Sequence, residues 1–404
     1  MGNDGTPIGE YERAQEFDLN SADIWQDPFP VYDMLRGMCP VVQSNQVGWV
    51  VSGYEDVRRV TRDFARFRSD WGAKNPGPAR TPRTREPEDR AVRPFFPFPL
   101  LPIEVDPPDH AEYRKILGPM FTATAIADDW GDQVRQIARD LVGPLVAATE
   151  WEAVQQLSWP MSGYALSAVA GIPTANRTEF QELVQDMDGN MSQIVDFVDA
   201  QISRAEMGAF AELRRGVVRG RSMTRDEKLG YGVVLVIAGW ETTAASISDM
   251  VYRLGTDSKL RDELAEHPEN WDSAVEEFLR IDAPVHALWR TAGEDTEVRG
   301  CPVRTGDKVL PLWASANRDP QQFPDPDKFV AGRRPNRHLA FGVGAHYCLG
   351  AHLARLELRV LLEELLTRMP RFEIRNPSTV RWIIPDGSIR RISSLPVTNP
   401  TGKE

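Results

Sequence analysis

The sequence predicts a mainly α-helical protein with a small β portion, folded as a single domain. Apolar residues recur at helical spacing almost without interruption from His110 to about Met250. Strand-like alternation is confined to short stretches such as residues 298–312, which a Gly306-Asp307 turn divides. A chain of 404 residues is long enough for two or three domains. Its chemical motifs, however, lie far apart and belong to one site, so we expect one domain.

The N-terminal part alternates short helices with a hairpin. Residues 1–27 are polar and form an N-terminal extension. A first helix is expected over residues 28–36, because a proline precedes its apolar positions. Residues 41–54 alternate apolar and polar positions around two glycines, which predicts a hairpin. Residues 55–67 again have helical spacing.

Residues from about 72 to 102 differ from their surroundings. They are rich in proline and arginine, and periodicity vanishes there. We predict a long flexible loop on the substrate side. A loop of this length is typical of a lid over a binding pocket, although such a composition is equally typical of a solvated excursion without a function.

The middle of the chain is predicted to be helical. Its longest helix carries the sequence Glu241-Thr242-Thr243 near its centre. Apolar residues at three-to-four spacing predict helices over residues 138–148, 159–170, 177–187, 194–215, 225–254 and 260–280.

The C-terminal part combines coil, one long helix and short strands. Residues 321–340 are rich in proline and arginine and predict coil, whereas residues 351–369 are strongly helical. Short β segments follow Pro370. We therefore expect one domain over residues 28–398 and a tail over residues 399–404.

Composition excludes several classes of protein. The net charge of −12 argues against general nucleic-acid binding. The three cysteines are too few and too scattered for a disulfide framework, which fits a reducing cytoplasm. Residues 1–20 lack the basic and apolar regions of a signal peptide. The apolar run at residues 233–238 is far shorter than the roughly 20 residues of a membrane span, so no membrane anchor is expected.

The most informative segment is Phe341-Gly342-Val343-Gly344-Ala345-His346-Tyr347-Cys348-Leu349-Gly350. Its glycines allow tight turns and a close approach of the backbone to a flat group. A helix that begins just after Cys348 directs free N–H groups and the positive end of its dipole at the sulfur. Such an environment favours the thiolate, which is the form that binds haem iron.

Two other interpretations of Cys348 stay open at this point. A lone cysteine is most often a small buried side chain. Zinc is the second alternative, because His346 and His352 lie close to Cys348 in the sequence. A structural zinc site needs four nitrogen or sulfur ligands in paired spacings, and no second pair is present.

The pattern Phe-x-x-Gly-x-x-x-Cys-x-Gly resembles the haem-ligand loop of the cytochrome P450 family, and every fixed position is filled. The resemblance implies the cytochrome P450 fold and a haem b cofactor, iron protoporphyrin IX, with Cys348 as the iron ligand. It also implies cofactor contacts from Phe341, Gly342 and Gly350. Relatives without a membrane anchor are the soluble bacterial kind.

Glu277 and Arg280 lie three residues apart on one predicted helix, where the two side chains can pair. Such a pair alone is a weak signal, because exposed ion pairs contribute little to stability. The P450 resemblance implies that a later arginine joins them in a structural lock. We assign that place to Arg333, with the adjacent Arg334 as a rival.

Four basic residues are expected at the haem propionates. His110 and Arg114 follow the sequence Asp106-Pro107-Pro108-Asp109 and lie four residues apart on one helix face. The resemblance implies that this pair binds a propionate, since a buried carboxylate needs cationic or hydrogen-bonding partners. The further donors expected are Arg290 and His338.

The sequence Ala238-Gly239-Trp240-Glu241-Thr242-Thr243 resembles the oxygen-activation segment of the family. Without that resemblance, small residues here are equally consistent with close helix packing. The resemblance implies that Ala238 and Gly239 leave room beside the haem, and that Glu241 and Thr242 deliver protons. Trp240 has no assigned role.

The remaining candidates form a substrate pocket. They are apolar, so we expect a small hydrophobic substrate, although aromatic and methionine residues are equally common in a core. His286 is a polar outlier near this group. The candidates are Phe95, Phe96, Phe98, Met187, Met191, Val234, Ala287, Leu288 and Ile389.

Electrons must come from a partner, because no flavin or nicotinamide domain fits in the chain. The resemblance implies a ferredoxin with its ferredoxin reductase. We expect the ferredoxin to dock on the cysteine side at Arg114, Lys115, Arg355 and Arg359, although the same residues are consistent with ordinary surface solvation.

The expected function is a monooxygenase that inserts one oxygen atom from O₂ into its substrate, by hydroxylation or oxidative dealkylation. Two alternatives stay open, a peroxide-driven haem-thiolate enzyme and a haem-binding sensor without turnover. Both have little use for the pair of Glu241 and Thr242.

Overall fold

The computed structural model describes residues 14–19, 21–69, 98–384 and 388–400. Most of this part of the chain is helical. The helices are α2 (Ala22–Gln26), α3 (Phe29–Met38), α4 (Tyr54–Arg62), α5 (Asp109–Leu117), α6 (Ala123–Ala125), α7 (Gly131–Ala147), α8 (Trp159–Ala170), α9 (Arg177–Gln185), α10 (Met187–Arg204), α11 (Gly208–Arg215), α12 (Arg225–Thr256), α13 (Ser258–Glu266), α14 (Trp271–Ile281), α15 (Trp313–Ala316) and α16 (Ala351–Arg368).

The main sheet joins strands from distant parts of the chain. Its strand order is β1-β2-β10-β7-β3, in which β2 and β10 are parallel and the other neighbours are antiparallel. Its strands are β1 (Val41–Ser44), β2 (Gly48–Val51), β3 (Phe67–Arg68), β7 (Arg290–Ala292) and β10 (Lys308–Pro311).

Smaller sheets complete the β portion. A three-stranded sheet has the order β11-β14-β4, and three hairpins pair β5 with β6, β8 with β9, and β12 with β13. These strands are β4 (Glu150–Glu152), β5 (Val217–Val218), β6 (Arg221–Ser222), β8 (Thr296–Val298), β9 (Cys301–Val303), β11 (Glu373–Ile374), β12 (Trp382–Ile383), β13 (Arg391–Ile392) and β14 (Pro396–Thr398).

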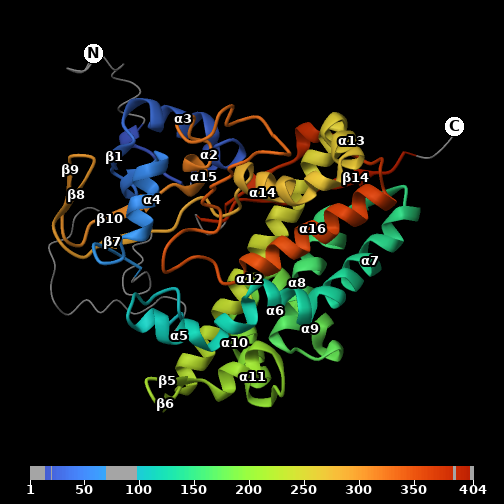
Figure 1. Cartoon of the computed structure of the whole chain (residues 1–404), viewed down its shortest axis with the longest axis horizontal. Helices are drawn as coiled ribbons and strands as arrows, with labels where there is room; N and C mark the ends of the chain where they lie inside the picture. The colour runs from blue at the N-terminus through green and yellow to red at the C-terminus, as the bar shows by residue number, and fades with distance from the viewer. Residues whose placement is uncertain (1–13, 20, 70–97, 385–387, 401–404) are drawn as a thin grey trace.

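The main sheet and most of the helices occupy opposite sides of the molecule (Figure 1). In Figure 1 the sheet lies on the left with α3 and α4, and α7, α8 and α9 lie on the right. Helices α12 and α16 pass between these two parts. The segments that carry the predicted chemistry therefore meet near the centre.

Helix α12 is the central element. A capping box starts it, in which Glu227 N–H donates to Thr224 Oγ1 and Thr224 N–H donates to the Glu227 carboxylate. By length and composition alone this helix is apolar enough to cross a membrane, but 67% of its most apolar window is buried inside the molecule. That burial is expected of a core helix.

Most predicted elements are present, and two long ones are divided. The expected helix over residues 194–215 is wrong in one respect, because α10 and α11 are separate helices. Gly208 has a φ of +75° and lies against Gly171, whose φ is +83°, and this backbone conformation is incompatible with a continuous helix. The expected helix over residues 260–280 is likewise divided into α13 and α14, with Pro268 at the interruption.

Candidate active site

One cavity brings together segments that are distant in the sequence. It is bordered by α5, by the middle of α12, by the first turns of α16 and by the loop that precedes α16, and its lining is mostly apolar. The predicted site residues that line it are His110, Arg114, Val234, Ala238, Gly239, Thr242, Leu288, Arg290, Phe341, Cys348 and Gly350.

The cysteine loop is shaped by its glycines. Gly342 and Gly344 have φ values of +66° and +85°, which other residues rarely adopt. The Cys348 N–H donates to the Phe341 carbonyl at 2.9 Å and closes the loop. A Cβ atom on Gly350 would meet nothing within 4 Å, so the cavity stays open directly beside the cysteine.

The proton of Cys348 is governed by two opposing effects. Burial raises the pKa of the thiol, whereas a hydrogen bond from the Gly350 N–H and the charges of Arg114 and Arg355 lower it. Burial has the larger effect, but the N–H at the start of α16 favours the thiolate, as expected from the sequence. A metal ion bound to a cysteine removes the thiol proton, and the surrounding N–H and cations favour that state.

Cationic and hydrogen-bonding groups gather in the same cavity. The His110 Nε2 atom is buried without a hydrogen-bond partner among the described residues. The Arg290 side chain is also buried, and among the described residues it donates a hydrogen bond to the carbonyl of the adjacent Trp289 at 2.9 Å. Buried polar groups of this kind need partners. They fit a ligand that carries carboxylates, as haem does.

The pKa values show how strongly these groups are desolvated. Burial, with help from the charges of His346 and Arg114, lowers the pKa of His110 to about 4. Burial also lowers the pKa of Arg290 to about 10, despite the nearby Asp106. An anion in this cavity would offset the cost of burying both groups.

The structure does not bring His338 into this group. Its Nε2 atom lies 3.1 Å from a Glu276 carboxylate oxygen, and its Nδ1 atom accepts from the Ala340 N–H at 3.2 Å. Both ring nitrogens of His338 thus have partners outside the cavity, so neither is free to bind a propionate as expected.

His346 lies where His338 was expected. It lines the cavity, its Nε2 atom lies 2.9 Å from a carboxylate oxygen of Asp106, and its ring centroid is 4.3 Å from that of His110. From the sequence, His346 was expected only as a possible zinc ligand. In the described part of the chain no group of three or more His, Cys, Asp or Glu side chains can hold a metal ion, which removes the zinc alternative. The position of His346 two residues before Cys348 is the feature of the sequence that could have indicated its place in the cavity.

The α12 wall of the cavity is built by small residues. A Cβ atom on Gly239 would lie 2.9 Å from Leu166 Cδ1, so glycine permits the close approach of α8. The Ser162 hydroxyl of α8 donates to the carbonyls of Gly239 and Trp240 at 3.2 and 2.8 Å. The Thr242 hydroxyl lines the cavity and donates to the Ala238 carbonyl at 2.8 Å.

The neighbouring residues of α12 point elsewhere. Glu241 is not among the cavity-lining residues, and a carboxylate oxygen of its side chain accepts from Arg391 Nε at 2.6 Å. The Trp240 indole packs on Trp159 with ring centroids 5.3 Å apart and donates to the Trp159 carbonyl. Trp240 therefore belongs to the helix interface, which explains a residue that the sequence left without a role.

Glu277 forms the predicted lock with two arginines. Its carboxylate accepts from Arg280 Nε and Nη2 at 2.7 and 2.8 Å and from Arg333 Nε at 2.9 Å. The Val330 N–H and the Asn336 amide complete its partners. Glu277 and Arg280 are fully buried. This arrangement ties α14 to the coil before the cysteine loop.

The substrate-pocket candidates are divided. Phe98, Ala287 and Ile389 are buried and Met191 lies on α10, but none of these four lines the cavity. His286 turns away to bond the Tyr32 hydroxyl at 2.8 Å. Phe95, Phe96 and the side chain of Met187 lie outside the described residues. Apolar residues that sequence reasoning missed also line the cavity: Ile103, Phe121, Leu166 and Leu235.

A cavity that places a cysteine beside cationic groups and a hydroxyl-bearing helix defines a haem-thiolate protein. The Cytochrome P450 family model matches residues 147–393, which is more than half of the chain. The chain belongs to the cytochrome P450 family, whose members bind haem through a cysteine thiolate, and it is a P450 monooxygenase.

Its relatives include bacterial enzymes with different substrates. Cytochrome P450 monooxygenase PikC of Streptomyces venezuelae is 31% identical, covering 95% of this chain and 93% of that protein. Vitamin D(3) 25-hydroxylase of Pseudonocardia autotrophica is 30% identical, covering 95% and 97%. The structure of cytochrome P450 CYP109Q5 from Chondromyces apiculatus superimposes with a TM-score of 0.82 at 28% identity, covering 97% and 100%.

Proposed function

We propose that this monooxygenase inserts one oxygen atom from O₂ into a small hydrophobic substrate, with electrons from a ferredoxin and its reductase in the cytoplasm. The observation that carries the proposal is the shared cavity, in which Cys348, Thr242 and mostly apolar side chains line one space. An apolar pocket with few polar groups suits an apolar ligand. Hydroxylation and oxidative dealkylation both fit this chemistry.

Haem bound in the cavity supplies the redox chemistry of oxygen activation. In this proposal the Cys348 sulfur holds the iron, and His110, Arg114, Arg290 and His346 bind the carboxylates. We assign to Thr242 the transfer of protons into the cavity, because its hydroxyl both lines the space and can exchange its bond to the Ala238 carbonyl. Glu241 supplies protons from outside after release from Arg391.

In this proposal the ferredoxin docks on the face that carries Cys348. Of the four basic residues expected there, Lys115 is the most exposed, and its ammonium pairs with Glu112. Arg355 pairs with Glu276, and Arg359 pairs with Asp272. Arg114 lines the cavity. A partner at this face therefore competes with existing ion pairs, and we expect turnover to fall as ionic strength rises.

The test of the proposal is the coupling of electrons to product in Thr242→Ala. We expect substrate binding to persist while product per NADH falls severalfold and hydrogen peroxide rises. Thr256→Ala is the matched control, because Thr256 makes the same bond to the carbonyl four residues earlier, at the far end of α12. Unchanged coupling in Thr242→Ala would contradict the proposed role. Equal product from hydrogen peroxide alone would instead favour a peroxide-driven enzyme.

A further inference from the structure

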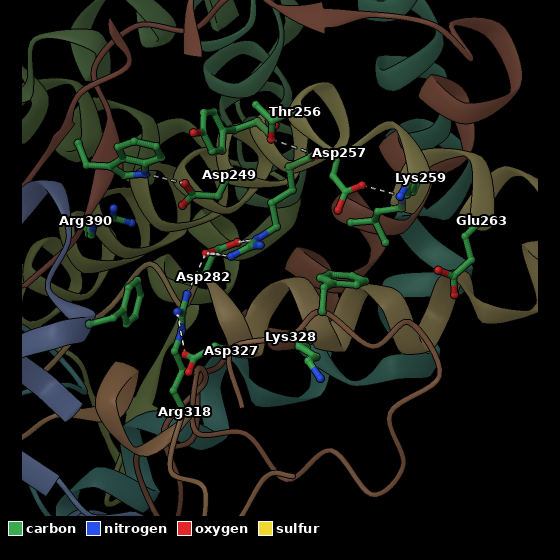
Figure 2. A pocket seen from close by; sticks show the side chains of 16 residues that line it. Asp249, Thr256, Asp257, Lys259, Glu263, Asp282, Arg318, Asp327, Lys328 and Arg390 are labelled. Atoms are coloured by element: carbon green, nitrogen blue, oxygen red, sulfur yellow. Dashed lines mark hydrogen bonds and ion pairs between the residues drawn. The ribbon is translucent and has the colours of Figure 1, made fainter. Parts of the chain in front are cut away.

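A second pocket opens at the far end of α12. It is bordered by the C-terminal half of α12, the start of α13 and the β12 strand, and Figure 2 shows its side chains. Charged groups dominate its inner part. Asp249 lies near Asp282 and Arg390 there (Figure 2). Arg253 donates to the Asp282 carboxylate, and the Trp382 indole donates to Asp249.

A polar stripe on α12 links this pocket to the haem cavity. Thr242, Ser246, Asp249 and Arg253 are spaced by four, three and four residues, which places them on one helix face. Thr242 and Ser246 line the haem cavity, whereas Asp249 and Arg253 line the second pocket. The Ser246 hydroxyl bonds the Thr242 carbonyl at 3.2 Å. Side chains with exchangeable protons thus lie on successive turns of α12, from the haem cavity to the second pocket.

Asp249 is buried without being locked to an arginine. It is 4% exposed, and its hydrogen bond among the described residues comes from Trp382 Nε1 at 2.9 Å. The neighbouring guanidinium groups bond other acceptors. Arg253 Nη2 bonds Asp282 at 2.8 Å, and Arg390 bonds the backbone carbonyls of Trp25 and Gln26 at 2.9 Å.

Two buried aspartates of this pocket, Asp249 and Asp282, have pKa values that are shifted in opposite directions. Burial and the charge of Asp282 raise the pKa of Asp249, against the opposing effects of Arg390, Trp382 and Arg253. Although burial also acts on Asp282, its bonds and proximity to arginines lower the pKa of that carboxyl. A proton shared by the pair therefore resides on Asp249, the member that lies on the polar stripe.

We propose that the stripe is a second proton route into the haem cavity, with Asp249 as its entry group. The Asp249 carboxylic acid gives its proton to the Ser246 hydroxyl. That hydroxyl turns away from the Thr242 backbone carbonyl and passes its own proton to the Thr242 hydroxyl, and water in the second pocket reprotonates Asp249. The route rests on the proposed monooxygenase function. It runs separately from Glu241, which is held by Arg391 on another face of α12.

The test uses Asp249→Asn in a Glu241→Gln background. Asparagine keeps the shape of the side chain and an acceptor for Trp382 but cannot relay a proton. We expect turnover about a hundredfold below that of Glu241→Gln, a loss at the low end of general acid–base effects. Substrate affinity, measured by the spectral shift, should stay unchanged. Ser246→Ala in the same background should reproduce the loss through a different residue.

The pH profile separates a proton route from a structural role. In Glu241→Gln we expect the rate to fall as pH rises and Asp249 loses its proton, and Asp249→Asn should remove that dependence. Asp327→Asn, at the rim of the same pocket, should leave both rate and profile unchanged. Equal turnover with and without Asp249→Asn would overturn the route while leaving the Thr242 coupling result intact. Normal coupling in Thr242→Ala would overturn both proposals.

Discussion

At the scale of single residues, two histidines near Cys348 have different partners. His346 lines the cavity and pairs with Asp106, whereas His338, the one expected at a propionate, pairs with Glu276. The sequence contains both histidines within ten residues of Cys348. Only the path of the loop decides which ring faces the cavity, and spacing cannot predict that path.

The two histidines predict different mutant phenotypes. His346→Ala should accelerate haem loss by about tenfold, because it removes a donor held in place by Asp106. His338→Ala should retain haem but lower the free energy of unfolding by about 1 kcal/mol through its lost bond to Glu276. Haem transfer to an apo-acceptor protein and chemical denaturation measure the two effects. The reverse pattern would restore the sequence-based assignment.

At the scale of elements, the sequence predicted where most helices lie but not where two of them are interrupted. The α8 helix has the predicted bounds, residues 159–170, and α12 ends two residues beyond its prediction. The predicted helix over residues 194–215 is interrupted because Gly208 packs against Gly171, the residue that follows α8. Such a contact depends on tertiary structure, so local periodicity carries no sign of it.

A glycine of α12 has a comparable packing role near the cavity. A Cβ atom on Gly230 would overlap the backbone carbonyl of Pro99, in the segment that leads to the cavity-lining Pro102. We expect Gly230→Ala to lower the free energy of unfolding by about 2 kcal/mol or more and to weaken substrate binding. Gly131→Ala, at the start of α7 with nothing within 4 Å, should change stability by less than about 1 kcal/mol. Equal effects of the two substitutions in chemical denaturation would contradict this role.

At the scale of the whole molecule, ion pairs join segments that are far apart in the sequence. Glu241 pairs with Arg391, 150 residues away, and Glu277 pairs with Arg333, 56 residues away. The family resemblance predicted the second pair because its motif is fixed. No fixed motif marks Arg391 as the partner of Glu241, so the sequence predicted a role for Glu241 but not this ion pair.

Partly exposed ion pairs also contribute to the acid stability of the fold. Hydrogen bonds from Arg221 and Tyr113, despite burial, lower the pKa of Glu227 from its ordinary value of 4.5 to about 2. Burial raises the pKa of Glu276, but Arg355 and His338 bring it to about 2. A carboxyl with a depressed folded pKa stabilises the fold above pH 4.5, and that contribution is lost as the pH falls toward 2.

We therefore expect the free energy of unfolding to decrease between pH 4.5 and 2. Glu227→Gln should lower stability at neutral pH and make the decrease shallower, because one linked proton is removed. The exposed Glu182→Gln should leave both unchanged. Denaturation at a series of pH values measures the slope, and a slope unaffected by Glu227→Gln would contradict the assignment.

The absorption spectrum of the reduced protein with carbon monoxide decides whether the Cys348 sulfur is the iron ligand. We expect the red-shifted band that an anionic sulfur ligand produces, and we expect Cys348→Ala to abolish it. Absence of the band in the parent protein, or its survival in Cys348→Ala, would contradict the account.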